Sequence, residues 1–118
     1  MRLIDLADNI YVGVTDIEAA SAWYIEHLQM RPVVISSDDA SYVTLGFDKK
    51  ADIALFLGPR TQESAPSPVF STSNAEKARE MLDRRGVHVG PIETDRQGTR
   101  SFIMRDIEGN EIEIAELP

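Results

Sequence analysis

The segment that closes the chain, residues 105–117, carries the side chains best suited to chemistry. Within it, Glu111 and Glu113 alternate with isoleucines. Successive residues of a β-strand point to opposite faces, so both carboxylates would lie on one face and the isoleucines on the other. A carboxylate in a partly dry pocket can ligate a divalent cation, pair with a cationic ligand, or take a proton from a substrate carbon. The residues leave these roles of Glu113 open.

Composition and charge exclude several classes of site and partner. The 118 residues include no cysteine, which excludes disulfides, zinc ribbons, iron–sulfur clusters and thiol nucleophiles. A formal net charge of −8 would repel the phosphates of nucleic acids and the head groups of anionic membranes. No stretch of the sequence has the apolar length of a membrane span. We therefore expect a cytoplasmic protein with a small-molecule partner and with no nucleic-acid or membrane partner.

The apolar pattern of the first half predicts one strand, one helix and three further strands. Ile10, Val12 and Val14 alternate with less apolar residues, as in a half-buried strand. A capping box, Thr15-x-x-Glu18, then precedes apolar residues at helical spacing. The predicted strands of this half are residues 9–14, 31–36, 41–47 and 52–57, and its helix carries Ile17, Ala20, Tyr24 and Leu28.

The same order of elements returns in the second half, after a linker rich in Pro and Ser at residues 59–66. A second capping box, Ser73-x-x-Glu76, precedes a helix that ends at Gly86. The predicted strands of this half are residues 68–72, 87–92, 100–105 and 111–116, and its helix carries Ala75, Ala78 and Leu82. We interpret the repeated order as an internal duplication. The prediction is one domain, residues 1–118, made of module one (1–58) and module two (67–118).

Two segments and the repeat resemble a known superfamily. The stretch VGVTDIEAASAWYIEHLQMRPV is similar to the strand–Asp–helix opening of the vicinal oxygen chelate proteins, and RDIEGNEIEIAE is similar to their DPDGN.IEL ending. That superfamily contains glyoxalase I, bleomycin-resistance proteins, fosfomycin-resistance thiol transferases and extradiol dioxygenases. The resemblance implies an α+β fold of tandem βαβββ modules, whose mixed, curved sheets form an open cup. It also implies a homodimer, in which sheets from two subunits complete each cup.

The resemblance further implies where a metal would bind. Metalloenzymes of the superfamily take their ligands, as His, Gln or Glu, from the first and fourth strands of each module. These positions correspond to Asn9, Ala54, Ser67 and Glu113. Only Glu113 keeps a strong ligand type, whereas Zn²⁺ and Fe²⁺ favour several imidazole or carboxylate ligands. We therefore expect no cofactor, with a divalent metal ion at Glu113 as the alternative.

Strand alternation predicts which side chains line the cup. The predicted ligand-binding residues are Asn9, Tyr11, Asp52, Phe56, Ser67, Glu111 and Glu113. Aromatic faces together with carboxylates suit a planar or cationic organic ligand, through stacking and charge pairing. Under a simpler interpretation, Tyr11 and Phe56 belong to the core, while Asp52 and Glu111 only flank solvated turns.

Three functions are consistent with these residues. The first is metal-independent binding of a small organic ligand, cationic and aromatic, of the kind that the bleomycin-resistance branch sequesters. The second is a divalent-metal-dependent lyase, isomerase or dioxygenase of the glyoxalase or dioxygenase type, in which Glu113 is a ligand or a base. The third is metal-free acid–base catalysis, with Glu113 as the catalytic residue. The depleted ligand set favours the first, and the sequence does not name the ligand.

Overall fold

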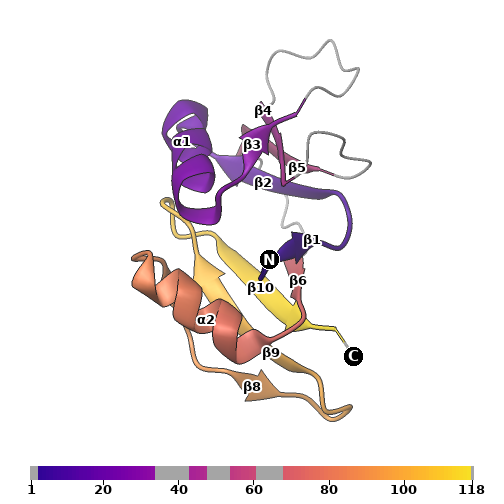
Figure 1. Cartoon of the computed structure of the whole chain (residues 1–118). Coiled ribbons are helices and arrows are strands. Elements are labelled where there is room, and N and C mark those ends of the chain that lie inside the picture. Colours follow the sequence, from indigo (N-terminus) through magenta and orange to yellow (C-terminus); the bar gives the residue numbers. More distant parts are fainter. Residues whose placement is uncertain (1–2, 34–42, 48–53, 61–67, 118) are drawn as a thin grey trace.

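A computed structural model of the chain describes residues 3–33, 43–47, 54–60 and 68–117 (Figure 1). The predicted site residues Asp52 and Ser67 lie outside these ranges. The elements of the first half are β1 (Asp5–Leu6), β2 (Ile10–Val14), α1 (Ile17–Leu28), β3 (Arg31–Pro32), β4 (Val43–Gly46) and β5 (Leu55–Pro59). Those of the second half are β6 (Val69–Thr72), α2 (Ala75–Arg84), β7 (His88–Val89), β8 (Glu93–Thr94), β9 (Arg100–Arg105) and β10 (Glu111–Glu116). The short strand β1 was not predicted.

Apart from β1, the strands of each half form one mixed sheet, and the two sheets share one strand order. The first sheet runs β2-β5-β4-β3 and the second β6-β10-β9-β7, with β1 added beside β6 and β8 beside β9. In both sheets the strand before the helix lies parallel to the last strand of its half. This shared order confirms the predicted α+β fold of two βαβββ units. The described strands do not close into a barrel, and the exact module boundaries stay a prediction.

The second strand of module two is interrupted where one continuous strand, residues 87–92, was predicted. The structure places the short strand β7 within this range and a second short strand, β8, just after it, and both pair with β9. Gly90, Pro91 and Ile92 separate the two strands, and the proline has no N–H to donate to the ladder. The Gly90 N–H still bonds the Ile103 carbonyl at 2.8 Å. The break therefore includes a residue that cannot donate to the ladder.

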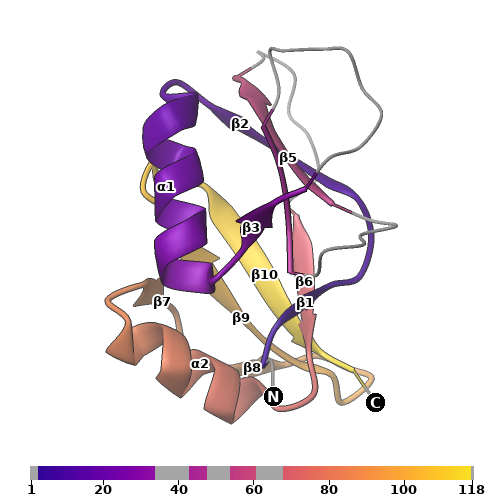
Figure 2. The same ribbon diagram turned by 45° about the horizontal axis from the view of Figure 1, so that its top comes forward.

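Both helices cover the same side of the two sheets, and one hydrophobic core joins the modules (Figure 2). The buried residues of α1 are Ala20, Tyr24 and Leu28, and those of α2 are Ala75, Ala78 and Leu82, as the helical spacing predicted. The facing strand residues include Val12, Val14, Leu55, Leu57, Phe70, Phe102, Ile112 and Ile114. Between the modules, the rings of Phe47 and Phe70 meet edge to face at 6.1 Å.

The helix starts correct the predicted capping boxes by one residue. The N-cap residues are Asp16 and Asn74, whose side chains accept hydrogen bonds from the N–H groups of Ala19 and Lys77, each at 3.0 Å. A capping box needs its glutamate three residues after the N-cap, and the shift leaves the two predicted glutamates one position too early. The boxes were therefore wrong, because a carboxylate and an amide replaced the hydroxyls as caps.

Gly86 ends α2 as predicted, in a Schellman motif. Its N–H bonds the Asp83 carbonyl, and the N–H of the buried Val87 bonds the Leu82 carbonyl, both at 3.0 Å. The φ of Gly86 is +82°, and a Cβ added there would meet nothing within 4 Å. We therefore expect Gly86→Ala to lower the free energy of unfolding by about 1 kcal/mol, through backbone strain alone.

The matched control for this substitution is Gly90→Ala. Gly90 has no positive φ, and an added Cβ would make one ordinary contact at 3.6 Å. Urea unfolding of both variants separates strain from packing. Equal losses of stability in the two variants would contradict the assignment of strain to Gly86.

Candidate functional site

The faces of the two sheets that point away from the helices carry the predicted ligand-binding residues that the structure describes. On the first sheet, Tyr11 of β2 pairs with Phe56 of β5, and both side chains are half-buried. On the second sheet, Glu113 is half-buried and Glu111 is exposed, and both alternate with buried isoleucines of β10. The structure therefore brings together the two aromatic residues on one sheet and the two carboxylates on the other.

Tyr11 and Glu111 also have partners within the protein. The Tyr11 hydroxyl donates a hydrogen bond to the Pro59 carbonyl, so the ring lies along the sheet toward the end of β5. The Glu111 carboxylate lies 3.4 Å from the Arg105 guanidinium on the neighbouring strand β9. Both groups of that ion pair are about half exposed, so the pair contributes little to stability. It does reduce the negative charge that Glu111 could offer to a ligand.

Asn9 uses its amide oxygen to hold the first sheet together. Its Oδ1 accepts a hydrogen bond from the Ala54 N–H at 2.8 Å, while the Ala54 carbonyl accepts one from the Ile10 N–H at 3.1 Å. These two bonds extend the β2–β5 ladder by one step. Ala54 itself is fully buried. Asn9 therefore has a structural role in this arrangement, and its oxygen already has a donor.

The strand register corrects the counterpart of Glu113 in module one. Tyr11 and Val69 hold equivalent places, because each precedes the N-cap residue of its helix by the same interval. Glu113 pairs with Val69, and Phe56 pairs with Tyr11. The counterpart of Glu113 is thus Phe56 and not Ala54. The sequence comparison misplaced it because the two modules differ in length between their first and last strands.

The donor set does not fit a transition-metal site. The described residues contain no group of three or more His, Cys, Asp or Glu side chains that could hold a metal ion. Of the four predicted ligand positions, Ser67 lies outside the described residues, and Asn9 already bonds the backbone. The position equivalent to Glu113 in module one is occupied by Phe56, which has no ligand atom. Glu113 makes no hydrogen bond or ion pair with another described side chain, so its carboxylate is available to a ligand.

The closing motif, residues 105–110, has a structural role that sequence reasoning missed. Asp106 is buried, and its Oδ1 accepts hydrogen bonds from the N–H groups of Glu108 and Asn110, each at 2.9 Å. Its Oδ2 accepts the hydroxyl of the fully buried Tyr24 on α1 at 2.8 Å and the Asn110 side chain at 3.0 Å. Burial, followed by the charge of Asp106, raises the pKa of Tyr24 well above 10, so this hydroxyl stays a donor.

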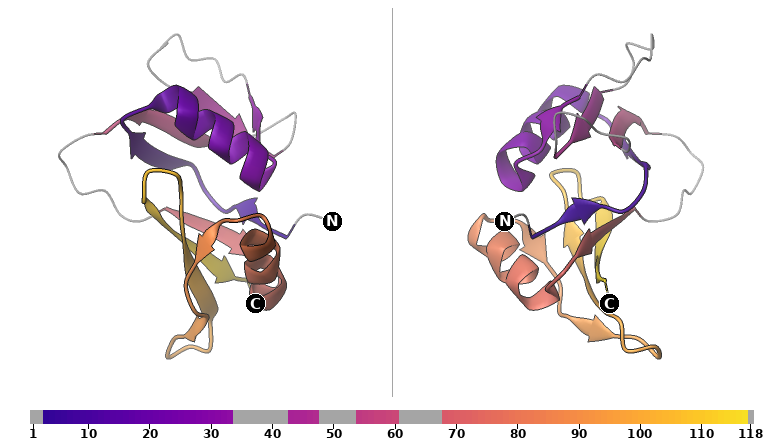
Figure 3. Two further views of the ribbon diagram at one scale, coloured as in Figure 1. Left: turned by 90° about the vertical axis from the view of Figure 1, so that its left-hand side faces the viewer. Right: turned by 45° about the vertical axis from the view of Figure 1, so that its right-hand side comes forward.

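Glu108 of the same motif binds the start of α1 from the other module. The turn between β9 and β10 lies beside α1 (Figure 3, left). Its carboxylate accepts the backbone N–H groups of Thr15 (2.8 Å) and Asp16 (2.9 Å) and the guanidinium of Arg60 (3.2 Å). Partial burial on its own raises the pKa of Glu108. The hydrogen bonds from Asp16, Thr15 and Arg60 outweigh it and lower that pKa from 4.5 to about 2. The motif thus fastens module two to the helix of module one.

A signal for this role was present in the sequence. The turn at residues 95–99 has the same backbone bonds as the turn at residues 106–110, and Asp95 Oδ1 accepts the N–H groups of Gln97 and Thr99 in the same way. Both turns contain a glycine at φ +82°. The two Asp-x-x-Gly sequences, DRQG and DIEG, therefore indicate turns that are held by their own aspartate and do not require a bound ligand. Only the structure shows that the second one reaches the other module.

Comparison with known proteins agrees with this architecture. A model of the Glyoxalase/Bleomycin resistance protein/Dioxygenase superfamily matches residues 6–114. The chain belongs to this superfamily. A superfamily member from Sphaerobacter thermophilus DSM 20745 has a similar solved structure, with a TM-score of 0.74 at 23% identity, covering 93% of this chain and 96% of that one.

Two further solved structures resemble this chain. TnmS3, described as an antibiotic binding protein from Streptomyces sp. CB03234, has a TM-score of 0.73 at 20% identity and covers 94% of this chain and 95% of its own. The integron cassette protein VCH_CASS1, from the mobile metagenome of V. Cholerae, has a TM-score of 0.64 at 26% identity and covers 100% and 98%. No curated protein matches the chain. Among the described residues, none of the helices is long and apolar enough to cross a membrane.

Proposed function

We propose that this superfamily member binds a small organic ligand, planar and cationic, without a metal, on the helix-free faces of its sheets. The observation that carries the proposal is the pairing of two aromatic residues, Tyr11 and Phe56, on one sheet, with the available carboxylate of Glu113 on the other. Stacking on the rings and charge pairing with Glu113 would hold such a ligand. The structural neighbour TnmS3, which is described as an antibiotic binding protein, supports binding of a small molecule as the function.

A homodimer is part of the proposal. In a single chain the described sheets leave their helix-free faces only half-buried at Tyr11, Phe56 and Glu113, and a second subunit would complete the enclosure. Sedimentation at twice the chain mass of 13.1 kDa is the expected result. A cytoplasmic location also stays a prediction.

The alternative function is that of a divalent-metal-dependent lyase, isomerase or dioxygenase. One observation favours it, because the available, half-buried carboxylate of Glu113 is a metal ligand type. Against it stands the donor set described above, in which Asn9 is already bonded to the backbone. Metal-free acid–base chemistry at Glu113 has no described partner residue that would make it specific.

Substitutions on the two sheets test the binding site. With proflavine, a planar cationic dye, as the probe, we expect Tyr11→Ala and Glu113→Gln each to weaken binding by about tenfold, because each removes a stacking or charge contact. Isothermal calorimetry measures the change. Glu93→Gln, which removes one charge from an exposed strand, is the matched control and should bind as the wild type does.

A metal titration separates the two functions. The melting temperature of chelator-treated protein is measured with Mn²⁺, Fe²⁺, Ni²⁺, Zn²⁺ and Mg²⁺, and again for Glu113→Ala. A metal ion present at a free concentration of 100 times its Kd would stabilise the fold by about 2.7 kcal/mol. We expect no shift that depends on Glu113. A shift that disappears in Glu113→Ala would establish the metalloenzyme alternative instead.

A further inference from the structure

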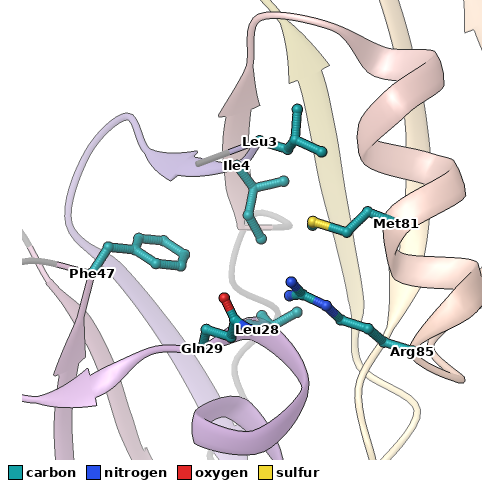
Figure 4. Close-up of a pocket in the computed structure, with 7 residues that line it drawn as sticks. All are labelled: Leu3, Ile4, Leu28, Gln29, Phe47, Met81 and Arg85. Carbon is teal, nitrogen blue, oxygen red and sulfur yellow. The ribbon is translucent and has the colours of Figure 1, made fainter. Parts of the chain in front are cut away.

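A cavity lies on the helix side of the sheets, between the two modules and away from the proposed ligand site. Its volume is about 290 Å³, close to the lower end of the range for small-molecule sites. Its apolar wall comes from the N-terminal segment, from both helices and from the end of β4 (Figure 4). The residues of this wall are Leu3, Ile4, Leu28, Phe47 and Met81. We call this space the intermodule cavity.

One charged group faces the apolar wall. Figure 4 shows the Arg85 guanidinium and the Met81 thioether turned toward the centre of the intermodule cavity, with the Gln29 amide beside them. Arg85 donates one hydrogen bond to the His27 carbonyl at the end of α1, at 3.1 Å. That carbonyl is the single acceptor of its side chain among the described residues. The remaining N–H groups of a guanidinium, which has five, are therefore available to a ligand.

The mouth of the intermodule cavity is more basic than the chain as a whole. A second hollow of about 490 Å³ shares Leu3, Met81 and Arg85 with it and adds the side chains of one face of α2. Of these, Arg84 is paired with Glu80 at 2.6 Å. Lys77 and Arg85 have no acidic partner among the described residues. Two cations without a described acidic partner thus lie at or beside the mouth of the intermodule cavity, in a protein whose net charge is −8.

We propose that the intermodule cavity binds an aliphatic monocarboxylate. The carboxylate would take the free N–H groups of Arg85, and a guanidinium can hold a carboxylate through two parallel hydrogen bonds. The alkyl chain would lie between Met81, Phe47 and Leu28, where removal of its methylene groups from water favours binding. This site is separate from the proposed function, because the ligand faces of Tyr11 and Glu113 lie on the other side of the sheets.

Octanoate is the probe for this site, with octanol as its uncharged counterpart. Calorimetric titration of the full chain should show saturable binding of octanoate, and octanol should bind about tenfold more weakly or not at all. Arg85→Gln should lose about tenfold in octanoate affinity, because it keeps a donor for the His27 carbonyl but no charge. The matched control is Arg84→Gln, one residue away and already paired with Glu80, and it should bind within about twofold of the wild type.

Two further variants keep the test decisive. Met81→Phe narrows the intermodule cavity without changing its charge, so it should weaken octanoate binding even if Arg85→Gln does not fold. Glu113→Gln should leave octanoate binding unchanged, which separates this site from the proposed function. No saturable binding, equal binding of octanoate and octanol, or equal losses in Arg84→Gln and Arg85→Gln would overturn the proposal.

Discussion

Asp106→Ala is expected to lower the free energy of unfolding by about 3 kcal/mol and the melting temperature by roughly 10 °C. The substitution leaves the Tyr24 hydroxyl, which is buried in α1, without its acceptor. It also removes the acceptor for the backbone N–H groups of Glu108 and Asn110, so the turn loses its internal support. A buried donor left without a partner is one of the causes of large losses of stability in point mutants. Thermal unfolding followed by circular dichroism measures the effect.

Asp95→Ala is the control for this substitution, because its turn makes the same local hydrogen bonds in an exposed position. Its loss in free energy of unfolding measures the contribution of the hydrogen bonds within one turn, which we expect to be about 1 kcal/mol. The difference between the two variants then measures the bonds that join the modules. Similar losses for Asp95→Ala and Asp106→Ala would show that the connection to Tyr24 contributes nothing.

Glu108→Gln is expected to lower the free energy of unfolding by about 2 kcal/mol at pH 7. The folded-state pKa of Glu108 is about 2 and the ordinary value is 4.5, so the charged carboxylate stabilises the fold. Because the folded pKa is the lower one, this contribution is complete above about pH 4.5. It is lost as the pH falls from 4.5 to 2. The variant lacks the contribution throughout.

Chemical unfolding between pH 7 and pH 2 tests this dependence. The difference in stability between wild type and Glu108→Gln should shrink as the pH falls below 4.5 and should nearly vanish at pH 2. Glu80→Gln, which removes an exposed carboxylate paired with Arg84, should show a small difference at every pH. Parallel stability curves for wild type and Glu108→Gln would mean that the carboxylate charge does not hold the helix.

Local patterns predicted most of the fold. The alternation of Ile112 and Ile114 placed β10 at the residues where the structure has it, and the spacing of Ala78 and Leu82 gave the buried face of α2. These predictions succeeded because a strand or helix that covers one core repeats its apolar residues with its own period. The repeated order of elements also predicted the two βαβββ units, whereas the strand order within each sheet comes from the structure.

Pairing between distant segments could not be predicted in the same way. The register that makes Phe56 the counterpart of Glu113 depends on where two strands meet, and a length difference between the modules hides it in the sequence. The motif RDIEGNEIEIAE was interpreted through Glu113, but its first half fastens α1 through Asp106 and Glu108. Nothing in the sequence reports which distant N–H groups a surface carboxylate will meet.

The contact between Thr15 and Glu108 also limits how early the N-terminal half can reach its final structure during translation. The two residues are 93 positions apart, so the first turn of α1 leaves the ribosome long before Glu108 is translated. Until then, module one lacks both the Glu108 cap and the Asp106 acceptor for Tyr24. We expect the emerging N-terminal half to stay loosely packed on the ribosome and to reach its final structure only after the last turn has been made.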